Sequence, residues 1–243
     1  MAKVALITGA AQRIGRQIAQ YFHTNDWDLV LHYQTSKSQA HELCQQLNTA
    51  RTDSARLVNG DLSDLTCIEQ AATQWFNTDQ RLDLLINNAA VFPARRVDAI
   101  DLAHWEATIN TNLRAPLFLC QALAPKLEAS NGSIINITDV YAQLPLQAYS
   151  VYSISKAGLV MLTRALALEL APRIRVNAIS PGAILHPSTS ESDTTTWVDS
   201  MLERVPLSRT GNASDIAITA LYLATNSYTT GQVIAVDGGR LIG

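Results

Sequence analysis

The stretch NITDVYAQLPLQAYSVYSISK, residues 136–156, contains three side chains that could transfer protons. Tyr152 and Lys156 are four residues apart, so on a helix they would share one face. There the ammonium would lower the phenol pKa from its usual value of about 10. Asp139 stands thirteen positions before the tyrosine. The spacing predicts that Tyr152 is a proton donor, with an ordinary amphipathic helix as the alternative.

The charge of Asp139 bears on the kind of substrate. An ionised carboxylate would repel the alkoxide that forms when a carbonyl is reduced, so a ketone or aldehyde fits only if Asp139 is protonated. A substrate that presents N–H donors, or that needs a ring nitrogen protonated, fits well. The alternative is that Asp139 only accepts hydrogen bonds from backbone N–H groups of its own loop.

Seven short apolar runs alternate with helix-length segments and predict the strands that would position these residues. The runs are VALIT (4–8), DLVLHY (28–33), ARLVNG (55–60), LDLLIN (82–87), SIINIT (133–138), IRVNAIS (174–180) and VIAVDGG (233–239). Their hydrophobicity is continuous rather than alternating, which is typical of parallel strands covered on both faces. Residues 1–243 are therefore predicted to form a single α/β domain, doubly wound around a mostly parallel sheet.

The first run leads into TGAAQRIG, residues 8–15, and a helix is predicted from about Arg16. This order of strand, turn and helix is the context of a dinucleotide-binding loop. Gly9 and Gly15 would let the backbone approach a pyrophosphate at the helix N-terminus, where free N–H groups favour an anion. Arg13, where a third glycine could stand, would add a cation beside the phosphates. A tight turn without a ligand and a surface arginine are the alternatives.

The end of the second strand bears on the choice between NADP(H) and NAD(H). An acidic residue there holds the free ribose hydroxyls of NAD(H) and repels a 2′-phosphate, but HYQTSKS, residues 32–38, has no carboxylate. Thr35, Ser36 and Lys37 offer hydroxyls and a cation, so NADP(H) is favoured even if Thr35 or Ser36 also caps the next helix. Asp61 and Asn87 follow the third and fourth strands, where adenine and ribose would pass, or act as turn and capping residues.

Composition argues against several other classes of protein. The 18 basic and 21 acidic residues are intermixed and the formal net charge is −3, which predicts binding to neither nucleic acid nor a membrane surface. The apolar N-terminal run is too short for a signal peptide or a membrane span. Cys44, Cys67 and Cys120 are odd in number and lack metal-ligand spacing, which favours packing roles in a reducing cytoplasm and predicts no metal site.

Taken together with TGAAQRIG, several further motifs make the chain resemble the short-chain dehydrogenase/reductase family over nearly its whole length. They are INNAA (86–90), the asparagine of NTNL (Asn112), the pair Tyr152 and Lys156, and PGA (181–183). The resemblance implies a Rossmann-type seven-stranded sheet and hydride transfer from a nicotinamide. It also implies a catalytic set of Asn112, Asp139, Tyr152 and Lys156, although the family most often has serine at position 139. Homotetramers, assembled through the helices before and around the tyrosine and through the last strand, are a further expectation.

Within that family the chain resembles the pteridine reductases, which reduce pterin and folate rings with NADPH. The resemblance rests on TGAAQRIG with its arginine, LHY (31–33), the aspartate of NITD, QLPLQAYSVYSISK and LALELAPRIRVNAISPG. It implies that Phe92, otherwise an ordinary loop residue, stacks a planar pterin against the nicotinamide, and that Arg13, Asp139 and Tyr152 contact the substrate. Two positions differ from the branch. Thr35 stands where arginine often binds the 2′-phosphate, and Ala90 where serine often hydrogen-bonds the pterin.

The resemblance also implies a cofactor site at the carboxyl ends of the strands. Its expected residues are Gly9, Arg13, Ile14, Gly15, His32, Tyr33, Thr35, Ser36, Asp61, Leu62, Asn88, Ala89, Thr138, Tyr152, Lys156, Pro181, Gly182 and Ile184. The segment at about 183–205, which contains HPSTSESDTTTW, is predicted to be a lid over the substrate.

The sequence thus predicts a cytoplasmic NADPH-dependent pteridine reductase that transfers hydride to a dihydropterin or dihydrofolate and forms the tetrahydro product. The nearest alternative is a carbonyl reductase of the same family, such as a 3-oxoacyl carrier-protein reductase in which Asp139 is a tolerated variant. A protein that binds NADP without turnover is an alternative of another class. The intact set of Asn112, Tyr152 and Lys156 argues against it.

Overall fold

The computed structural model describes residues 2–76, 80–184 and 202–243. Its strands form a seven-stranded sheet in the order β3-β2-β1-β4-β5-β6-β7, and every neighbouring pair is parallel. All seven predicted strands are confirmed; the sheet is wholly parallel where the sequence predicted a mostly parallel one. The strands are β1 (Lys3–Ile7), β2 (Trp27–Tyr33), β3 (Ala55–Asn59), β4 (Leu84–Asn87), β5 (Ser133–Ile137), β6 (Arg175–Pro181) and β7 (Val233–Val236).

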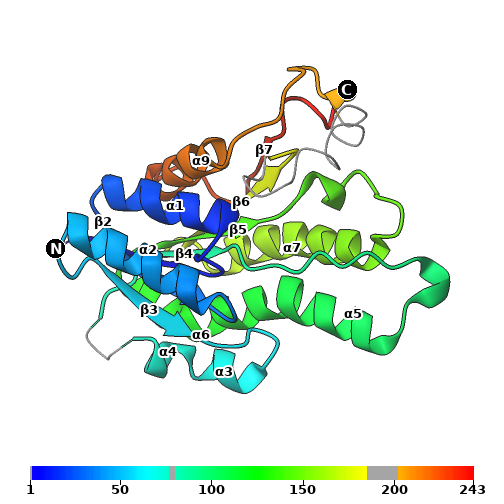
Figure 1. Cartoon of the computed structure of the whole chain (residues 1–243). Helices are drawn as coiled ribbons and strands as arrows, with labels where there is room; N and C mark the ends of the chain where they lie inside the picture. The colour runs from blue at the N-terminus through cyan, green and yellow to red at the C-terminus, as the bar shows by residue number, and fades with distance from the viewer. Residues whose placement is uncertain (1, 77–79, 185–201) are drawn as a thin grey trace.

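Helices cover both faces of the sheet (Figure 1). One face carries α1 (Arg13–Thr24), α2 (Lys37–Ala50) and α9 (Ala213–Thr225). The other carries α3 (Leu65–Glu69), α4 (Ala71–Gln74), α5 (Leu102–Ile109), α6 (Ala115–Ala129) and α7 (Ser150–Glu169). Helix α1 begins three residues before the predicted Arg16, because Gln12 already has the extended backbone of an N-cap and the first turn includes Gly15.

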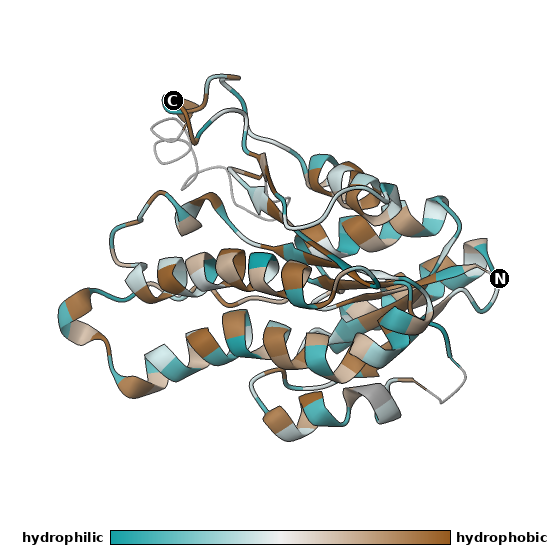
Figure 2. Cartoon of the chain, turned by 180° about the vertical axis from the view of Figure 1, so that it is seen from behind, coloured by the Kyte–Doolittle hydropathy of each residue, from teal (hydrophilic) through white to brown (hydrophobic). Residues whose placement is uncertain are grey.

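Two hydrophobic cores hold these layers together. Successive residues of a strand point to opposite faces, so Ile7 packs with Phe22 of α1 whereas Leu6 packs with Leu119 of α6. All four side chains are fully buried, and each such burial contributes about 1.5–3 kcal/mol. Figure 2 shows the resulting band of hydrophobic strands between helices of mixed hydrophobic and hydrophilic residues. The sheet is therefore a rigid frame for the loops at its edges.

The strand order reverses direction on either side of β1, because β2 and β4 are its two neighbours. In open α/β sheets, ligands bind in the crevice at the carboxyl ends of the strands at such a point. The glycine loop follows β1 there, and the loops after β4, β5 and β6 begin at the same end of the parallel strands. The fold thus brings together motifs that lie far apart in the sequence.

Helix α7 is, among the described residues, the one helix long and apolar enough by length and composition to cross a membrane. Of that stretch, 44% is buried inside the molecule. The helix packs on β6 and carries Tyr152 and Lys156 toward the sheet. Its place in the core therefore explains the apolar residues on its buried side only, because Ile154, Met161 and Leu168 are exposed.

Candidate active site

Asp139 and Tyr152 form the centre of the candidate site. Asp139 is the second residue after β5, and Tyr152 lies in the first turn of α7. The Tyr152 hydroxyl donates a hydrogen bond to Asp139 Oδ2 at 2.7 Å, and the Tyr141 backbone N–H donates to Asp139 Oδ1 at 2.9 Å. Asp139 therefore accepts from the backbone of its own loop and also from the tyrosine, so its carboxyl group does more than cap that loop.

Lys156 lies one helical turn beyond Tyr152 and is 2% exposed. Its ammonium donates to the carbonyl of Ile137 at 2.8 Å and lies 5.7 Å from the centre of the Tyr152 ring. Burial lowers the pKa of Lys156 to about 8, and the charge of Asp139 opposes that change. The lysine thus ties α7 to the end of β5.

The phenol is not acidified by this lysine. Burial, followed by the charge of Asp139, raises the pKa of Tyr152 above its ordinary value. The prediction that Lys156 lowers the phenol pKa is therefore wrong, because the carboxyl group contacts the phenol directly and the ammonium bonds a backbone carbonyl instead. Burial also raises the pKa of Asp139, in spite of its hydrogen bonds and nearby cations. The site favours proton-bearing forms of both groups.

Asn112 links the loop after β4 to helix α7 beside the site. It is 1% exposed and stands in a π-helical turn between α5 and α6, Asn110–Arg114. Its side-chain amide exchanges two hydrogen bonds of 2.9 Å with the backbone of Val91 and donates a third, of 3.1 Å, to Ser155 Oγ. Ser155 Oγ in turn donates to the Tyr152 carbonyl at 2.7 Å. The amide is used within the protein, so we assign Asn112 to positioning the loop after β4 against α7.

An aromatic wall borders the reaction centre. Phe92 is 49% exposed, stacks on Tyr149 with ring centres 4.2 Å apart and 17° between planes, and meets the Tyr152 ring edge-on at 4.5 Å. Tyr141 lies nearly parallel to Phe92 at 6.4 Å. Sequence reasoning missed Tyr141 and Tyr149. The available signals were the place of Tyr141 two residues after Asp139 and that of Tyr149 within QLPLQAYSVYSISK. Flat rings beside a proton donor suit a planar substrate.

The glycine loop has the shape of a phosphate cradle. Gly9 has a φ of +62°, a conformation that favours glycine. A Cβ on Gly15 would lie 2.4 Å from the carbonyl oxygen of Gly9 and 2.6 Å from Asn88 Nδ2. Asn88 Nδ2 donates to the carbonyls of Thr8 at 2.8 Å and Gly9 at 3.1 Å. Arg13, which is exposed, has a φ of +51°, at a cost of about 1–2 kcal/mol for a non-glycine residue.

Three predicted ligand-facing residues turn their side chains into the scaffold. His32 is 2% exposed; its Nδ1 accepts from the Gly9 N–H at 3.3 Å and its Nε2 donates to the Gly60 carbonyl at 3.1 Å. Burial lowers the pKa of His32 to about 4, so the imidazole is neutral. Thr138 Oγ1 donates to the Ile179 carbonyl at 2.8 Å, and Asn87 Nδ2 donates to Asn136 Oδ1 at 2.8 Å. The hydrogen bonds of these three side chains are made to neighbouring segments of the protein. The side chains therefore hold the scaffold of the site in place and do not point to a ligand.

Thr35, in the loop after β2, and Lys37, the first residue of α2, are exposed. Ser36 occupies the N-cap position of α2, but its side chain makes no capping hydrogen bond. Asp61, after β3, accepts from the backbone N–H and the hydroxyl of Ser63 at 2.8 Å each, so it is at least a turn residue. The side chains of Thr35 and Lys37 therefore stay available to a ligand, whereas those of His32 and Tyr33, at the end of β2, are buried.

The remaining predicted cofactor residues stand at or just after the carboxyl ends of strands or, for Ile14, in the first turn of α1. They are Ile14, Tyr33, Leu62, Ala89, Pro181, Gly182 and Ile184. Most of the predicted lid lies outside the described residues, which include only 183–184 and 202–205 of it. In the described part of the chain, no group of three or more His, Cys, Asp or Glu could hold a metal ion.

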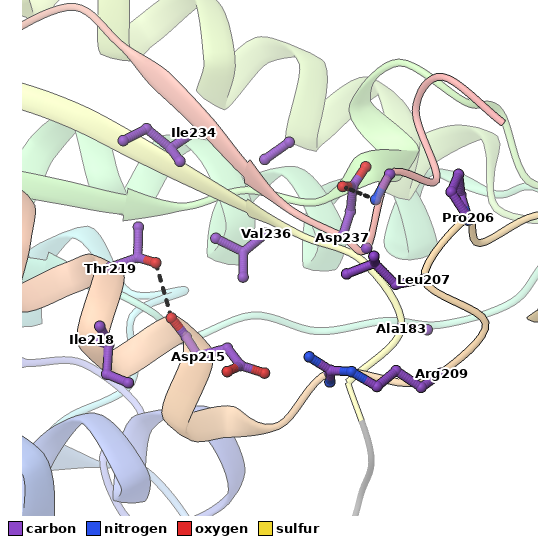
Figure 3. A pocket seen from close by; sticks show the side chains of 14 residues that line it. Ala183, Pro206, Leu207, Arg209, Asp215, Ile218, Thr219, Ile234, Val236 and Asp237 are labelled. Carbon is purple, nitrogen blue, oxygen red and sulfur yellow. Dashed lines mark hydrogen bonds between the residues drawn. The ribbon is translucent and has the colours of Figure 1, made fainter.

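A separate cavity of about 670 Å³ lies beside this site (Figure 3). Ile234 and Val236 of β7 line it from one side, and Ile218 and Thr219 of α9 from another. None of Asp139, Tyr152 and Lys156 lines it. The candidate proton-transfer residues therefore lie outside this cavity, which Asp237 and the two glycines that follow it help to line.

Comparison with known proteins decides the family. The enoyl-(acyl carrier protein) reductase family matches residues 9–240. The chain belongs to the short-chain dehydrogenase/reductase family. The 3-oxoacyl-(acyl-carrier-protein) reductase FabG of Staphylococcus epidermidis is 34% identical over 248 residues, which cover 98% of this chain and 99% of that protein. The 3beta-hydroxysteroid dehydrogenase 1 of Eggerthella lenta is 32% identical over 246 residues, 99% of this chain and 94% of that one.

Among solved structures, the chain is similar to a blue fluorescent protein from a metagenomic library, crystallised in complex with NADPH. The TM-score is 0.87 at 32% identity, and the match covers 98% of this chain and 97% of that one. The family and the sheet predicted from the sequence are thus confirmed. The relative from Staphylococcus epidermidis bears the name of the carbonyl-reducing alternative, and neither relative bears the name of a pteridine reductase.

Proposed function

We propose that the chain is an NADPH-dependent reductase of a pterin or folate ring, acting on a C=N bond. The observation that carries the proposal is the 2.7 Å hydrogen bond from Tyr152 to Asp139, at a position where the family most often has serine. A serine hydroxyl steadies a carbonyl oxygen, whereas a carboxyl group can hold and relay a proton. Phe92 and its neighbouring rings add a surface on which a flat heterocycle can stack.

Two features support a dinucleotide at the glycine loop. Side chains at Gly9 and Gly15 would fill the cradle, and its backbone leads into the N-terminus of α1, which favours a pyrophosphate. Thr35, Ser36 and Lys37 would hold a 2′-phosphate. When bound, the nicotinamide supplies the hydride. Pro181, at the end of β6, and Gly182 and Ile184, just beyond it, would contact the nicotinamide end.

The protein's own groups supply the proton. Reduction of a C=N bond places hydride on carbon and requires one proton on the adjacent nitrogen. Tyr152 and Asp139 share a hydrogen bond and both hold their protons to higher pH than usual, so either can donate while the other replaces the proton. A carboxyl that must be protonated acts at low pH and fails as pH rises through its raised pKa. We therefore expect an acidic optimum.

The second candidate is reduction of a carbonyl, as in a 3-oxoacyl-(acyl-carrier-protein) reductase. The relative from Staphylococcus epidermidis, at 34% identity over nearly the whole chain, favours it. In that case the protonated form of Asp139 would donate a hydrogen bond to the substrate oxygen in the place of the usual serine. The raised pKa of Asp139 is compatible with that role, so only substrates separate the two candidates.

A substrate panel tests the proposal. We would measure NADPH oxidation with dihydrobiopterin, dihydromonapterin, dihydrofolate and an acetoacetyl thioester. We expect at least one ring substrate to have the highest kcat/KM. A preference for the thioester would establish the carbonyl reductase instead, and tight NADPH binding without turnover of any of the four would favour a binding protein.

We predict that NADPH binds more tightly than NADH. The end of β2 has no carboxylate to repel the 2′-phosphate, and Thr35 and Lys37 are exposed there. One or two charge-assisted hydrogen bonds would favour NADPH by roughly 1–3 kcal/mol. Fluorescence titration of both reduced cofactors measures the difference, and equal dissociation constants would contradict it.

We predict that Phe92→Ala weakens binding of the ring substrate and leaves NADPH affinity nearly unchanged. Loss of an aromatic contact costs roughly 0.5–1.5 kcal/mol beyond the buried area, so KM or Kd should rise several-fold or more. Val97→Ala is the matched control, because Val97 belongs to the same connection and is 82% exposed. A parallel loss of substrate and NADPH affinity would indicate that Phe92 supports folding instead.

We also propose that the protein is a cytoplasmic homotetramer. Large apolar side chains stand exposed on three adjacent helices: Trp105 on α5, Leu117 on α6, and Ile154 and Met161 on α7. Pairing of these helices between subunits would remove that surface from water. Sedimentation analysis measures the assembly.

A further inference from the structure

The C-terminal residues form a built turn beside the candidate site. Asp237 follows β7, and its carboxylate accepts from the backbone N–H groups of Gly239 and Leu241 at 2.9 Å each. The first of these contacts is visible in Figure 3. Gly238 and Gly239 have φ values of +66° and +90°, so the turn relies on glycine at two successive positions. We call residues 237–243 the C-terminal turn.

This turn packs on the segments that border the site. A Cβ on Gly182 would lie 2.6 Å from the Asp237 Cα, so the loop after β6 and the turn are in direct contact. On the other side, the Leu207 N–H donates to the Gly238 carbonyl at 3.1 Å. In Figure 1 the red C-terminal segment accordingly runs beside the orange chain that precedes α9. The turn is therefore held in place rather than free in solution.

From this turn, Arg240 reaches the loop after β5. Its Nη2 donates to the Tyr141 hydroxyl at 3.2 Å, and its guanidinium carbon lies 5.2 Å from the centre of the Tyr141 ring. The second distance is within the range of a cation–π contact. These two residues are separated by 99 positions in the sequence. Arg240 thus contacts the residue whose backbone N–H donates to Asp139.

We propose that Arg240 is a positioning residue for the reaction, which acts through Tyr141 on the carboxyl group of Asp139. The contacts form a continuous path from Arg240 to the Tyr141 side chain, from the Tyr141 N–H to Asp139 Oδ1, and from Asp139 Oδ2 to Tyr152. The assignment of Arg240 as a residue that positions Tyr141 and Asp139 depends on these contacts alone. Its effect on pterin reduction rests on the proposed function.

Four groups face the Asp139 carboxyl and set its proton affinity. In decreasing order the hydrogen bonds from Tyr141 and Tyr152 and the charges of Lys156 and Arg240 lower its pKa, against the stronger effect of burial. Arg240 is the weakest of the four. Removing its charge raises the pKa of Asp139 further, so the carboxyl would keep its proton to higher pH.

The test compares Arg240→Gln with Arg240→Lys, which keeps the charge and loses the planar fork. Arg173→Gln is the matched control. Arg173 is exposed and precedes β6, so it lies at the amino-terminal end of the strands, away from the candidate site. The first readout is the ¹³C titration of Asp139 in the full-length protein labelled at aspartate, with the signal assigned by its loss in Asp139→Asn. The second is kcat/KM for the best substrate of the panel, with the NADPH dissociation constant measured alongside.

We expect the glutamine variant to titrate Asp139 at higher pH than the parent, and the lysine and Arg173→Gln variants to titrate it as the parent does. Because Asp139 then keeps its proton to higher pH, the pH profile of kcat/KM of the glutamine variant should shift to higher pH as well. At low pH, where the carboxyl is protonated in both proteins, we expect kcat/KM of the variant to be roughly tenfold lower, because the hydrogen bond from the charged Arg240 that positions Tyr141 is lost, with NADPH affinity kept. Identical titration of Asp139 in the parent and the glutamine variant would overturn the proposal.

The titration separates this proposal from the assignment of the substrate, because it needs no turnover. If the panel shows a carbonyl reductase, an unchanged titration in the glutamine variant still refutes the role of Arg240, and a shifted one still supports it. Tyr141→Phe covers the case in which the glutamine variant does not fold. It keeps the ring and the N–H but removes the hydroxyl that receives the Arg240 hydrogen bond, and it should raise the titration of Asp139 in the same direction by a smaller amount. No shift in that variant would count against the path.

Discussion

Asp139→Ser is expected to lower the rate of pterin reduction by about 10²- to 10⁴-fold, the range typical of a general acid. The serine hydroxyl can still bond Tyr152, but it cannot hold and return a proton near neutral pH. NADPH binding should be preserved, because Asp139 is not among the predicted cofactor contacts. Single-turnover rates at several pH values, with the NADPH dissociation constant, measure both effects.

Asp139→Asn is the matched control for shape. The amide keeps an oxygen for the Tyr152 hydroxyl and has nearly the size of the carboxyl group, but it cannot donate an acidic proton. Both variants should therefore lose activity, and the serine variant should gain weak carbonyl reductase activity because its hydroxyl can steady an alkoxide. If the serine variant reduces dihydropterins as fast as the parent across pH, Asp139 is only a turn residue.

Tyr152→Phe is expected to have a loss of similar size, about 10²- to 10⁴-fold, because it removes the donor that contacts Asp139. Burial and the Asp139 charge raise the pKa of Tyr152, so the phenol should remain protonated at pH values where a free tyrosine, with a pKa of about 10, already ionises. The parent should thus gain no more tyrosinate absorbance than the variant as the pH rises toward 10. Stopped-flow turnover and absorbance titration test the two parts.

Tyr149→Phe provides the comparison for this second prediction. It keeps the ring that stacks on Phe92 and removes only a hydroxyl outside the proton path. Its activity should stay close to that of the parent. A tyrosinate that appears in the parent below pH 10 and is absent from Tyr152→Phe would show that a bound ligand or Lys156 does acidify the phenol.

Local patterns determined most of the fold in advance. Continuous apolar runs such as SIINIT predict a strand buried on both faces, and residues Ser133–Ile137 form that strand as β5. The spacing of Tyr152 and Lys156 predicts one helical face, and both lie buried on α7. Gly9 and Gly15 mark the turn after β1, where a side chain would meet the backbone. These features depend on neighbours within a few residues, which the sequence displays directly.

Tertiary packing decided the pKa shifts of the site and the hydrogen-bond partners of its side chains. The i,i+4 spacing suggests that Lys156 acidifies Tyr152. In the structure, however, the Lys156 ammonium donates to the Ile137 carbonyl and the Tyr152 hydroxyl donates to Asp139. His32 follows the pattern of a cofactor residue, but its ring is buried between the Gly9 N–H and the Gly60 carbonyl. Arg240 meets Tyr141 across 99 positions. A pKa depends on burial and on charges brought together from distant parts of the chain, and spacing along the sequence contains neither.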